Sequence, residues 1–187
     1  MSNLTRLVLL TLLLAGEAVA QQVCNPAVTQ GTPTFRFEFM STETVLDLQT
    51  GLMWLRCPLG FAVDDRGTRD DYSDDLCSAS PGPQFFDWTG ALQAGAALNT
   101  SGGAGSYTDW RVPNIKELVT IVDRKCLRPA QNLAVFPEVR IATAWTSTTY
   151  EKLREAAYVD FEYGDNDQGQ KTALRLVRMV RSWVGPR

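Results

Sequence analysis

The segment WRVPNIKELVTIVD, from Trp110 to Asp123, combines a helix start signal with one buried helix face. Asn114 is a preferred N-cap residue, and Glu117, three residues later, can bond back to the N–H of the cap, which gives a capping box. The helix is therefore expected to begin at Ile115. The i, i+3, i+4, i+7 spacing of one apolar face follows at Ile115, Leu118, Val119 and Val122. Because Pro113 disfavours helical backbone at the preceding residue, the chain should enter this helix in an extended conformation.

The first twenty residues have the pattern of a secretory signal peptide. Arg6 precedes an apolar run over residues 7–15, and Ala18-Val19-Ala20 supplies small residues at positions −3 and −1 of a cleavage site. The run is too short to cross a bilayer as a stable helix. We expect cleavage after Ala20 and export to the periplasm, the cell surface or the medium, with no membrane span left. Cys24 lacks the small preceding residues of a lipidated cysteine, so no lipid anchor is expected.

The cysteine content is consistent with export. An even set of four in an oxidising compartment predicts two disulfides, although the sequence alone allows three different pairings. The set is Cys24, Cys57, Cys77 and Cys126. Metal ligation by these residues is the alternative, and it is weak because there is no C-x-x-C pair and no histidine.

The composition also restricts the function classes. Without histidine, neither a Ser-His-Asp nor a Cys-His nucleophile can be assembled, and paired cysteines leave no thiolate. An enzyme would have to use carboxylates, lysine or tyrosine. The net charge of −3 lacks the basic signature of nucleic-acid binding, so no nucleic-acid partner is expected.

The exported part should form an irregular arm at 21–34, a single domain at 35–182 and a tail at 183–187. Its class is α+β. Alternating or β-branched segments predict strands at 35–39, 44–48, 52–56, 144–149, 158–163 and 173–180. Both faces of the segment 52–56 are apolar, so this strand should be central in its sheet. Gly51 should take a positive φ in a turn at 49–51, and residues 164–169 should form the turn between the last two strands. Asp87 is expected to cap a helix over 88–98, whose shared face contains Trp88, Ala91, Leu92, Gly95 and Leu98.

Two acidic stretches could bind calcium, the one cofactor for which the sequence offers ligands, because hard cations prefer several carboxylate oxygens. The first lies between Cys57 and Cys77 and contains Asp64, Asp65, Asp70, Asp71, Asp74 and Asp75. The second has the D-x-D-x-G spacing of a calcium loop, with Asp165, Asp167 and Gly169. A solvated loop and a polar hairpin tip without metal are the alternatives, and we favour them because the ligand order is incomplete in both.

Several separated motifs together resemble the Lcl C-terminal domain family, exported bacterial domains named for the end domain of a collagen-like adhesin. The motifs are T-G-L-M-W at 50–54, Trp88 with Ala91-Leu92, W-R-V-P-N-x-x-E-L at 110–118, Phe136-Pro137, W-T-S-T at 145–148 and Val177-Arg178 with Val180-Arg181. The resemblance covers about residues 24–182. It implies a C-type lectin-like fold, two helices on small twisted antiparallel sheets, and the pairings Cys24–Cys126 and Cys57–Cys77.

The adhesin that gives the family its name binds sulfated glycosaminoglycans, so the resemblance implies that ligand only where basic side chains converge. One candidate cluster is Arg111, Lys116, Arg124, Lys125 and Arg128. The other is Arg175, Arg178 and Arg181 on the last predicted strand, where Arg178 takes the opposite face. Solvated arginines, or arginines paired with carboxylates, are the alternative.

Large rings at the motif positions are expected in the core, not on a sugar-stacking surface. These are Trp54, Trp88, Trp110 and Trp145, while Trp183 is undetermined. The sequence therefore favours an exported, non-catalytic binding module for adhesion or cell-surface recognition, with carbohydrate as the ligand class. A self-associating subunit of a surface fibre and a carboxylate-dependent enzyme are the alternatives.

Overall fold

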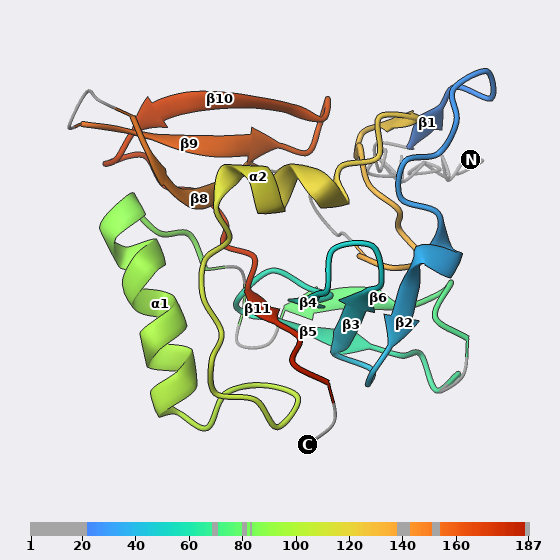
Figure 1. Ribbon diagram of the computed structural model, residues 1–187, viewed down its shortest axis with the longest axis horizontal. Helices are drawn as coiled ribbons and strands as arrows, with labels where there is room; N and C mark the ends of the chain where they lie inside the picture. The colour runs from blue at the N-terminus through green and yellow to red at the C-terminus, as the bar shows by residue number, and fades with distance from the viewer. Residues whose placement is uncertain are drawn as a thin grey trace, which may run out of the picture.

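The computed structural model describes residues 22–68, 71–79, 82, 84–137, 143–150 and 154–185, and the predicted signal peptide lies outside them. The fold is α+β, as predicted. Its regular elements are helix α1 (Trp88–Thr100), the short helix α2 (Ile115–Leu118), two 3-10 turns and small antiparallel sheets (Figure 1). None of the helices within the described residues is long and apolar enough to cross a lipid bilayer.

A four-stranded antiparallel sheet forms one half of the molecule, in the order β11-β4-β3-β2. Its strands are β2 (Phe37–Phe39), β3 (Thr44–Asp47), β4 (Leu52–Leu55) and β11 (Val180–Ser182). The prediction that the strand at 52–56 is central is confirmed, since β4 lies between β3 and β11 and all four of its residues are buried. Gly51 has a φ of 67° and closes the β3–β4 turn, as predicted.

A three-stranded antiparallel sheet forms the other half, with β9 (Glu155–Asp160) between β8 (Thr143–Thr149) and β10 (Asp165–Gln170). Two further strand pairs are small. One joins β1 (Val23–Cys24) to β7 (Cys126–Leu127), and the other joins β5 (Phe61–Asp64) to β6 (Leu76–Ala79). Figure 1 shows the three-stranded sheet at the top and the four-stranded sheet below it.

Helix α2 and the 3-10 turn η2 (Val119–Ile121) pack between the two larger sheets. The predicted capping box is present, because the Asn114 side chain accepts from the Glu117 N–H at 3.0 Å and the Glu117 carboxylate accepts from the Asn114 N–H at 2.8 Å. The helix begins at Ile115, as predicted. Its apolar face, with Leu118 and Ile121 fully buried, forms one core cluster with Trp54.

Helix α1 flanks the second core cluster. The Asp87 side chain accepts from the Gly90 N–H at 2.7 Å, which confirms the predicted cap, and the helix continues two residues past the predicted end. Its buried face consists of Ala91, Ala94 and Gly95. The prediction that Leu92 belongs to this face is wrong, since that side chain is 37% exposed.

The tryptophan predictions are confirmed at three positions and partly at the fourth. Trp54, Trp110 and Trp145 are buried in the core. Trp88, at the start of α1, is half-buried, and its Nε1 donates to the Thr146 carbonyl at 2.8 Å. None of these rings is a freely exposed stacking surface.

Two predictions for the last third are wrong. Residues 164–169 are not a turn, because Asp165–Gln170 is strand β10, and the chain already reverses at Gly164, which has a φ of 79°. A polar edge strand and a polar turn have similar composition, so the sequence did not separate them. Of the predicted strand at 173–180, only Val180 is in a strand; the preceding residues cross between the sheets through single bridges, Phe86 to Arg175 and Ala144 to Leu176.

The first predicted strand is also shorter than expected, because Thr34–Arg36 forms the 3-10 turn η1 and only Phe37–Phe39 is strand β2. Both disulfides have the pairing that the resemblance implies. Cys24–Cys126 fastens the N-terminal arm to β7, and Cys57–Cys77 closes the β5–β6 insertion. The arm is therefore a fixed part of the fold. The arm was predicted to end at residue 34, but η1 continues it to Arg36, so the name refers below to residues 22–36.

Candidate functional site

The last predicted strand does not present its arginines to a ligand. Arg178 is 1% exposed and donates to the Arg56 carbonyl at 3.0 Å and to Gln131 Oε1 at 3.1 Å. Arg181 is 5% exposed and donates to both carboxylate oxygens of Asp109, at 2.5 and 3.1 Å. These hydrogen bonds lower the pKa of Asp109. Both arginines belong to the interior and are excluded from a ligand surface.

Arg175 also has structural partners. Its guanidinium carbon lies 3.5 Å from the ring centroid of Tyr158 and 4.8 Å from that of Trp145, and Nη1 donates to Thr143 Oγ1 at 2.6 Å. Cation–π contacts of this kind are strongest when the cation is removed from water. Arg175 therefore fastens the crossing segment to the three-stranded sheet, and the predicted second basic cluster does not exist as a surface.

Two members of the first basic cluster are neutralised by neighbouring groups. Arg111 makes a two-pronged ion pair with Glu117, at 2.7 and 2.8 Å, which lowers the pKa of Glu117. Arg128 lies 3.3 Å from a Glu162 carboxylate oxygen and donates to the Tyr163 hydroxyl at 3.1 Å. Both arginines are therefore poor candidates for binding an external anion.

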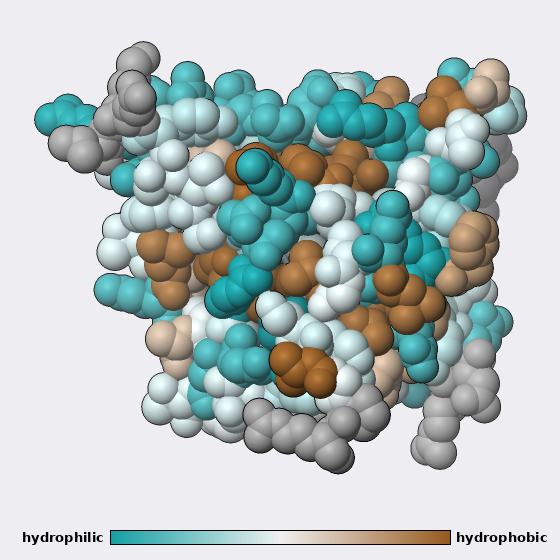
Figure 2. Space-filling view, in the orientation of Figure 1, coloured by the Kyte–Doolittle hydropathy of each residue, from teal (hydrophilic) through white to brown (hydrophobic). Residues whose placement is uncertain are grey.

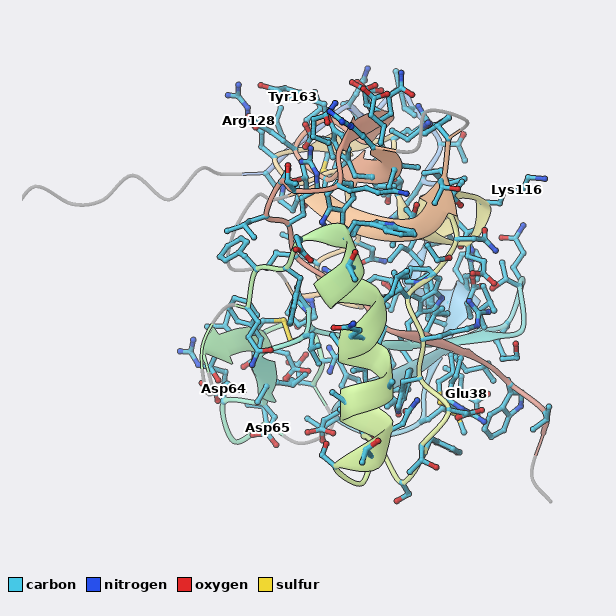
Figure 3. The ribbon with its side chains drawn as sticks, turned by 90° about the vertical axis from the view of Figure 1, so that its left-hand side faces the viewer. Glu38, Asp64, Asp65, Lys116, Arg128 and Tyr163 are labelled. Carbon is cyan, nitrogen blue, oxygen red and sulfur yellow. A yellow bond between two sulfur atoms is a disulfide. The ribbon has the colours of Figure 1, made fainter. Side chains whose placement is uncertain are left out.

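The remaining three, Lys116, Arg124 and Lys125, have no ion-pair partner within the part of the chain that the structure describes. Lys116 does not lie on one face with Arg128. Figure 3 shows Lys116 and Arg128 at opposite sides of the molecule, pointing away from each other. The structure thus separates residues that the sequence places close together, because the chain turns between α2 and β7.

The aspartates of the β5–β6 insertion lie mostly on its outer surface, where Figure 3 shows Asp64 and Asp65, while Asp70 is outside the described residues. Asp75 differs from the rest, since it is buried and pairs with Arg56 Nη1 at 2.5 Å. Asp165 and Asp167 are exposed on β10, in extended chain rather than in a calcium loop. Among the described residues, no three His, Cys, Asp or Glu side chains are grouped closely enough to hold a metal ion.

Two hollows that the sequence did not predict lie along the N-terminal arm. The amide hollow, of about 220 Å³, adjoins the Cys24–Cys126 disulfide, and its polar lining includes Gln22, Gln30, Lys125 and Gln131. The aromatic hollow, of about 420 Å³, is lined by Pro33, Phe35, Leu48 and Gln49, and also by Gln30. Because Gln30 borders both, the two hollows are neighbours along the arm.

The aromatic hollow carries two exposed large apolar side chains, one from the arm and one from the β3–β4 turn. Phe35 is 86% exposed and Leu48 is 58% exposed. Figure 2 shows apolar surface in brown along the right-hand margin of this face, where Figure 1 places the arm and η1. A solvent-exposed aromatic ring on a rigid turn is typical of binding surfaces.

Specific contacts hold the arm in place. Asn132 Nδ2 donates to the Thr32 carbonyl at 2.8 Å, and Gln22 Nε2 donates to the carbonyls of Pro129 and Gln131, both at 2.7 Å. Arg36, next to Phe35, pairs with Asp47 of β3. These contacts, together with the disulfide, fix both walls of the two hollows.

A third, smaller hollow of about 110 Å³ lies between the β5–β6 insertion and the end of α1. Its walls are mainly apolar and include Leu55, Pro58, Leu59 and Phe61. Glu43 is the one charged residue in the lining. It offers few groups that could orient a polar ligand.

Comparison with protein families gives one match. The Lcl C-terminal domain matches residues 43–181, a range that contains both helices and most of both larger sheets. No curated protein matches the chain. The arm and β2 precede the matched range, so the two hollows have one wall outside it and one wall within it. Since the match covers most of the sequence, the chain belongs to the Lcl C-terminal domain family.

Proposed function

We propose that this protein is an exported, non-catalytic binding module that acts in adhesion or cell-surface recognition, with carbohydrate as its ligand class. In this proposal residues 1–20 direct export and are removed, and the remainder acts in the periplasm, on the cell surface or in the medium. The two disulfides support this location, because disulfides persist in oxidising compartments.

The exposed Phe35 ring beside a surface hollow carries the proposal. The C–H groups of a sugar ring pack well on the negative face of an aromatic ring, and side-chain amides can both donate to and accept from sugar hydroxyls. The aromatic hollow offers this combination in one place, with Phe35 beside the side-chain amides of Gln30 and Gln49. The described cysteines are in disulfides, and Arg36, Arg56 and Arg181 are in ion pairs, so none of these groups is available for catalysis. This supports a binding role over a catalytic one.

We further propose that the fold is related to C-type lectin-like domains. Two features support the relation. Two helices pack on small antiparallel sheets, and a disulfide joins the N-terminal arm to the region after the second helix. The relation would agree with a recognition function, although fold alone does not assign one.

One observation favours the alternative of an assembly subunit. Strand β2 is the outer strand of its sheet within the described residues, and the exposed Phe35 and Leu48 lie beside it. Edge strands with apolar neighbours can pair with a second chain. Size-exclusion chromatography with light scattering separates the alternatives, since a binding module can remain monomeric whereas a fibre subunit should form oligomers that dissociate on dilution.

The proposal is tested with the mature chain on an oligosaccharide array, probed with and without calcium and over a range of salt concentrations. Retention by one class of glycan is expected. Binding that requires calcium would indicate that one of the acidic stretches binds this ion. Retention driven by sulfate groups would weaken steeply as the salt concentration rises. If no glycan on the array is retained under any of these conditions, the proposed function is wrong.

A further inference from the structure

We infer that the amide hollow and the aromatic hollow form one binding groove for an uncharged oligosaccharide, with one sugar unit on the Phe35 ring and the next among the amides around Gln30. This inference rests on the proposed function and adds the site and the ligand class. We call the combined feature the arm groove; it consists of the linings of both hollows.

Unused hydrogen-bonding groups border the arm groove. Within the described residues the Gln30 side chain has no hydrogen-bond partner, so two donors and one acceptor are available at the point that both hollows share. Gln22 uses its amide nitrogen on two backbone carbonyls and keeps its Oε1 as an acceptor. Gln49, in the aromatic hollow, has a second free amide. This set matches a ligand that carries several hydroxyl groups.

A deeper amide adds to this set. Gln131 lines the amide hollow, is fully buried, and accepts from Arg178 through its Oε1, while its Nε2 has no hydrogen-bond partner. Burying a donor without a partner costs about 1 to 3 kcal/mol, so such a group is rare without a reason. A ligand hydroxyl at the inner end of the amide hollow would supply the missing acceptor after a small rotation of that side chain.

The charge around the arm groove favours an uncharged ligand. Its lining contains two cationic residues, Arg36 and Lys125. Arg36 is neutralised by Asp47, which leaves Lys125 as the one cation of the lining without an ion-pair partner. A sulfated polymer needs several convergent cations. A single ammonium group can instead donate to sugar hydroxyls.

The rigidity of the groove also favours specific binding. The Cys24–Cys126 disulfide and the Asn132 to Thr32 hydrogen bond hold the amide hollow, and the Arg36–Asp47 pair holds the turn that carries Phe35. Because both walls are fixed in advance, little conformational entropy is lost when a ligand is ordered between them.

The test compares variants of the mature protein on the oligosaccharide that the wild-type protein retains best on the array, with affinity measured by titration calorimetry. Phe35→Ala and Gln30→Ala should each weaken binding at least about tenfold. Phe35→Trp should preserve binding and report it directly, since the new indole would change its fluorescence when a sugar stacks on it. Raising salt from about 50 to 500 mM should change the affinity less than about twofold, because no charged pair is involved.

Matched controls separate loss of the site from loss of the fold. Phe85→Ala removes another exposed phenylalanine, and Gln168→Ala removes an exposed amide on β10, so both should bind like the wild type. Thermal unfolding should be nearly unchanged in all four alanine variants, since each side chain is wholly or partly exposed. If the wild type binds a glycan and the Phe35 and Gln30 variants bind it equally well, the arm groove is not the site while the proposed function stands. A wild type that binds no glycan refutes both, and a steep salt dependence refutes the uncharged ligand.

Discussion

Replacing Asp75 with asparagine should destabilise the protein by about 3 kcal/mol. The Asp75 carboxylate is buried and pairs with Arg56, whose guanidinium is fully buried as well. Removing one partner of a buried ion pair typically costs about 3 to 5 kcal/mol, because the other charge stays behind in an apolar environment. Asparagine keeps the shape and one acceptor, and Arg56 still donates to the carbonyls of Thr42, Val135 and Ala134, so the low end of that range applies.

Urea denaturation of the mature protein with its disulfides intact measures this cost, and a parallel thermal scan should show a decrease in Tm of about 6 to 12 °C, at about 2 to 4 °C per kcal/mol for a chain of this size. Arg56→Met should cost more, since it leaves the Asp75 carboxylate unpaired and three backbone carbonyls without their donor. The matched control is Asp74→Asn, one residue away but exposed, which should change stability by less than about 0.5 kcal/mol. If the Asp75 and Asp74 variants unfold at the same urea concentration, the ion pair does not anchor the insertion.

Three other predictions concern stability. Asn114→Ala removes the cap of α2 and should cost about 1 kcal/mol in urea denaturation, whereas Asn114→Asp should be nearly neutral; equal losses in both would contradict the capping role. Burial acts to raise the pKa of Asp47, but the hydrogen bonds from Arg36 and Thr50 outweigh it and lower the pKa. Hydrogen bonds from Arg111 likewise hold the pKa of Glu117 below its usual value. Both carboxylates therefore stabilise the fold at pH values above their unfolded pKa values, and this part of the stability should be lost as the pH falls below about 4. A urea denaturation midpoint that stays constant from about pH 6 to about pH 2 would contradict this prediction. Replacing both cysteines of Cys57–Cys77 with serine should cost about 3 kcal/mol of stability. The same replacement at Cys24–Cys126 should cost about 4.7 kcal/mol, because this disulfide closes the longer loop. The unmodified native protein should show no titratable thiol.

Local signals in the sequence predicted the elements that local physics determines. The capping box at Asn114, the cap at Asp87 and the positive φ of Gly51 each depend on residues within one turn of each other. The central position of β4 followed from apolar residues on both of its faces. The disulfide pairing came from the family resemblance, because cysteine spacing alone leaves it open.

The errors lie where tertiary contacts override local pattern. The alternation of Phe35, Phe37 and Phe39 predicted one strand with one buried face, but Arg36 turns toward Asp47 and η1 leaves Phe35 in solvent. Pro33, just before η1, was the one local signal that the strand would start late. Arg178 and Arg181 read as surface cations because arginine is usually exposed, and nothing local to them reveals Gln131 or Asp109 as partners far along the chain.

The candidate site was missed for a related reason. The walls of its amide hollow come from the arm and from residues 125–133, which are about a hundred positions apart and are joined by Cys24–Cys126. No local pattern marks the polar residues of such a site, because glutamine and lysine are ordinary surface residues anywhere else. A pairing of these segments inferred from the disulfide could have shown that Gln22, Gln30 and Gln131 converge.

The proposed groove draws its two walls from parts of the chain with different structural demands. The matched range, residues 43–181, contains the capping box, the buried arginines and most of both core clusters, all of which restrict substitution because they are packed or hydrogen-bonded. The arm precedes that range and contributes Gln22, Gln30 and Phe35, none of which is buried. Substitutions at Gln30 and Phe35 would alter what the groove contacts at little cost in stability, whereas Gln22 also holds the arm through two hydrogen bonds. The Cys24–Cys126 disulfide, which fixes the arm to β7, therefore keeps this wall of the proposed groove in a constant position.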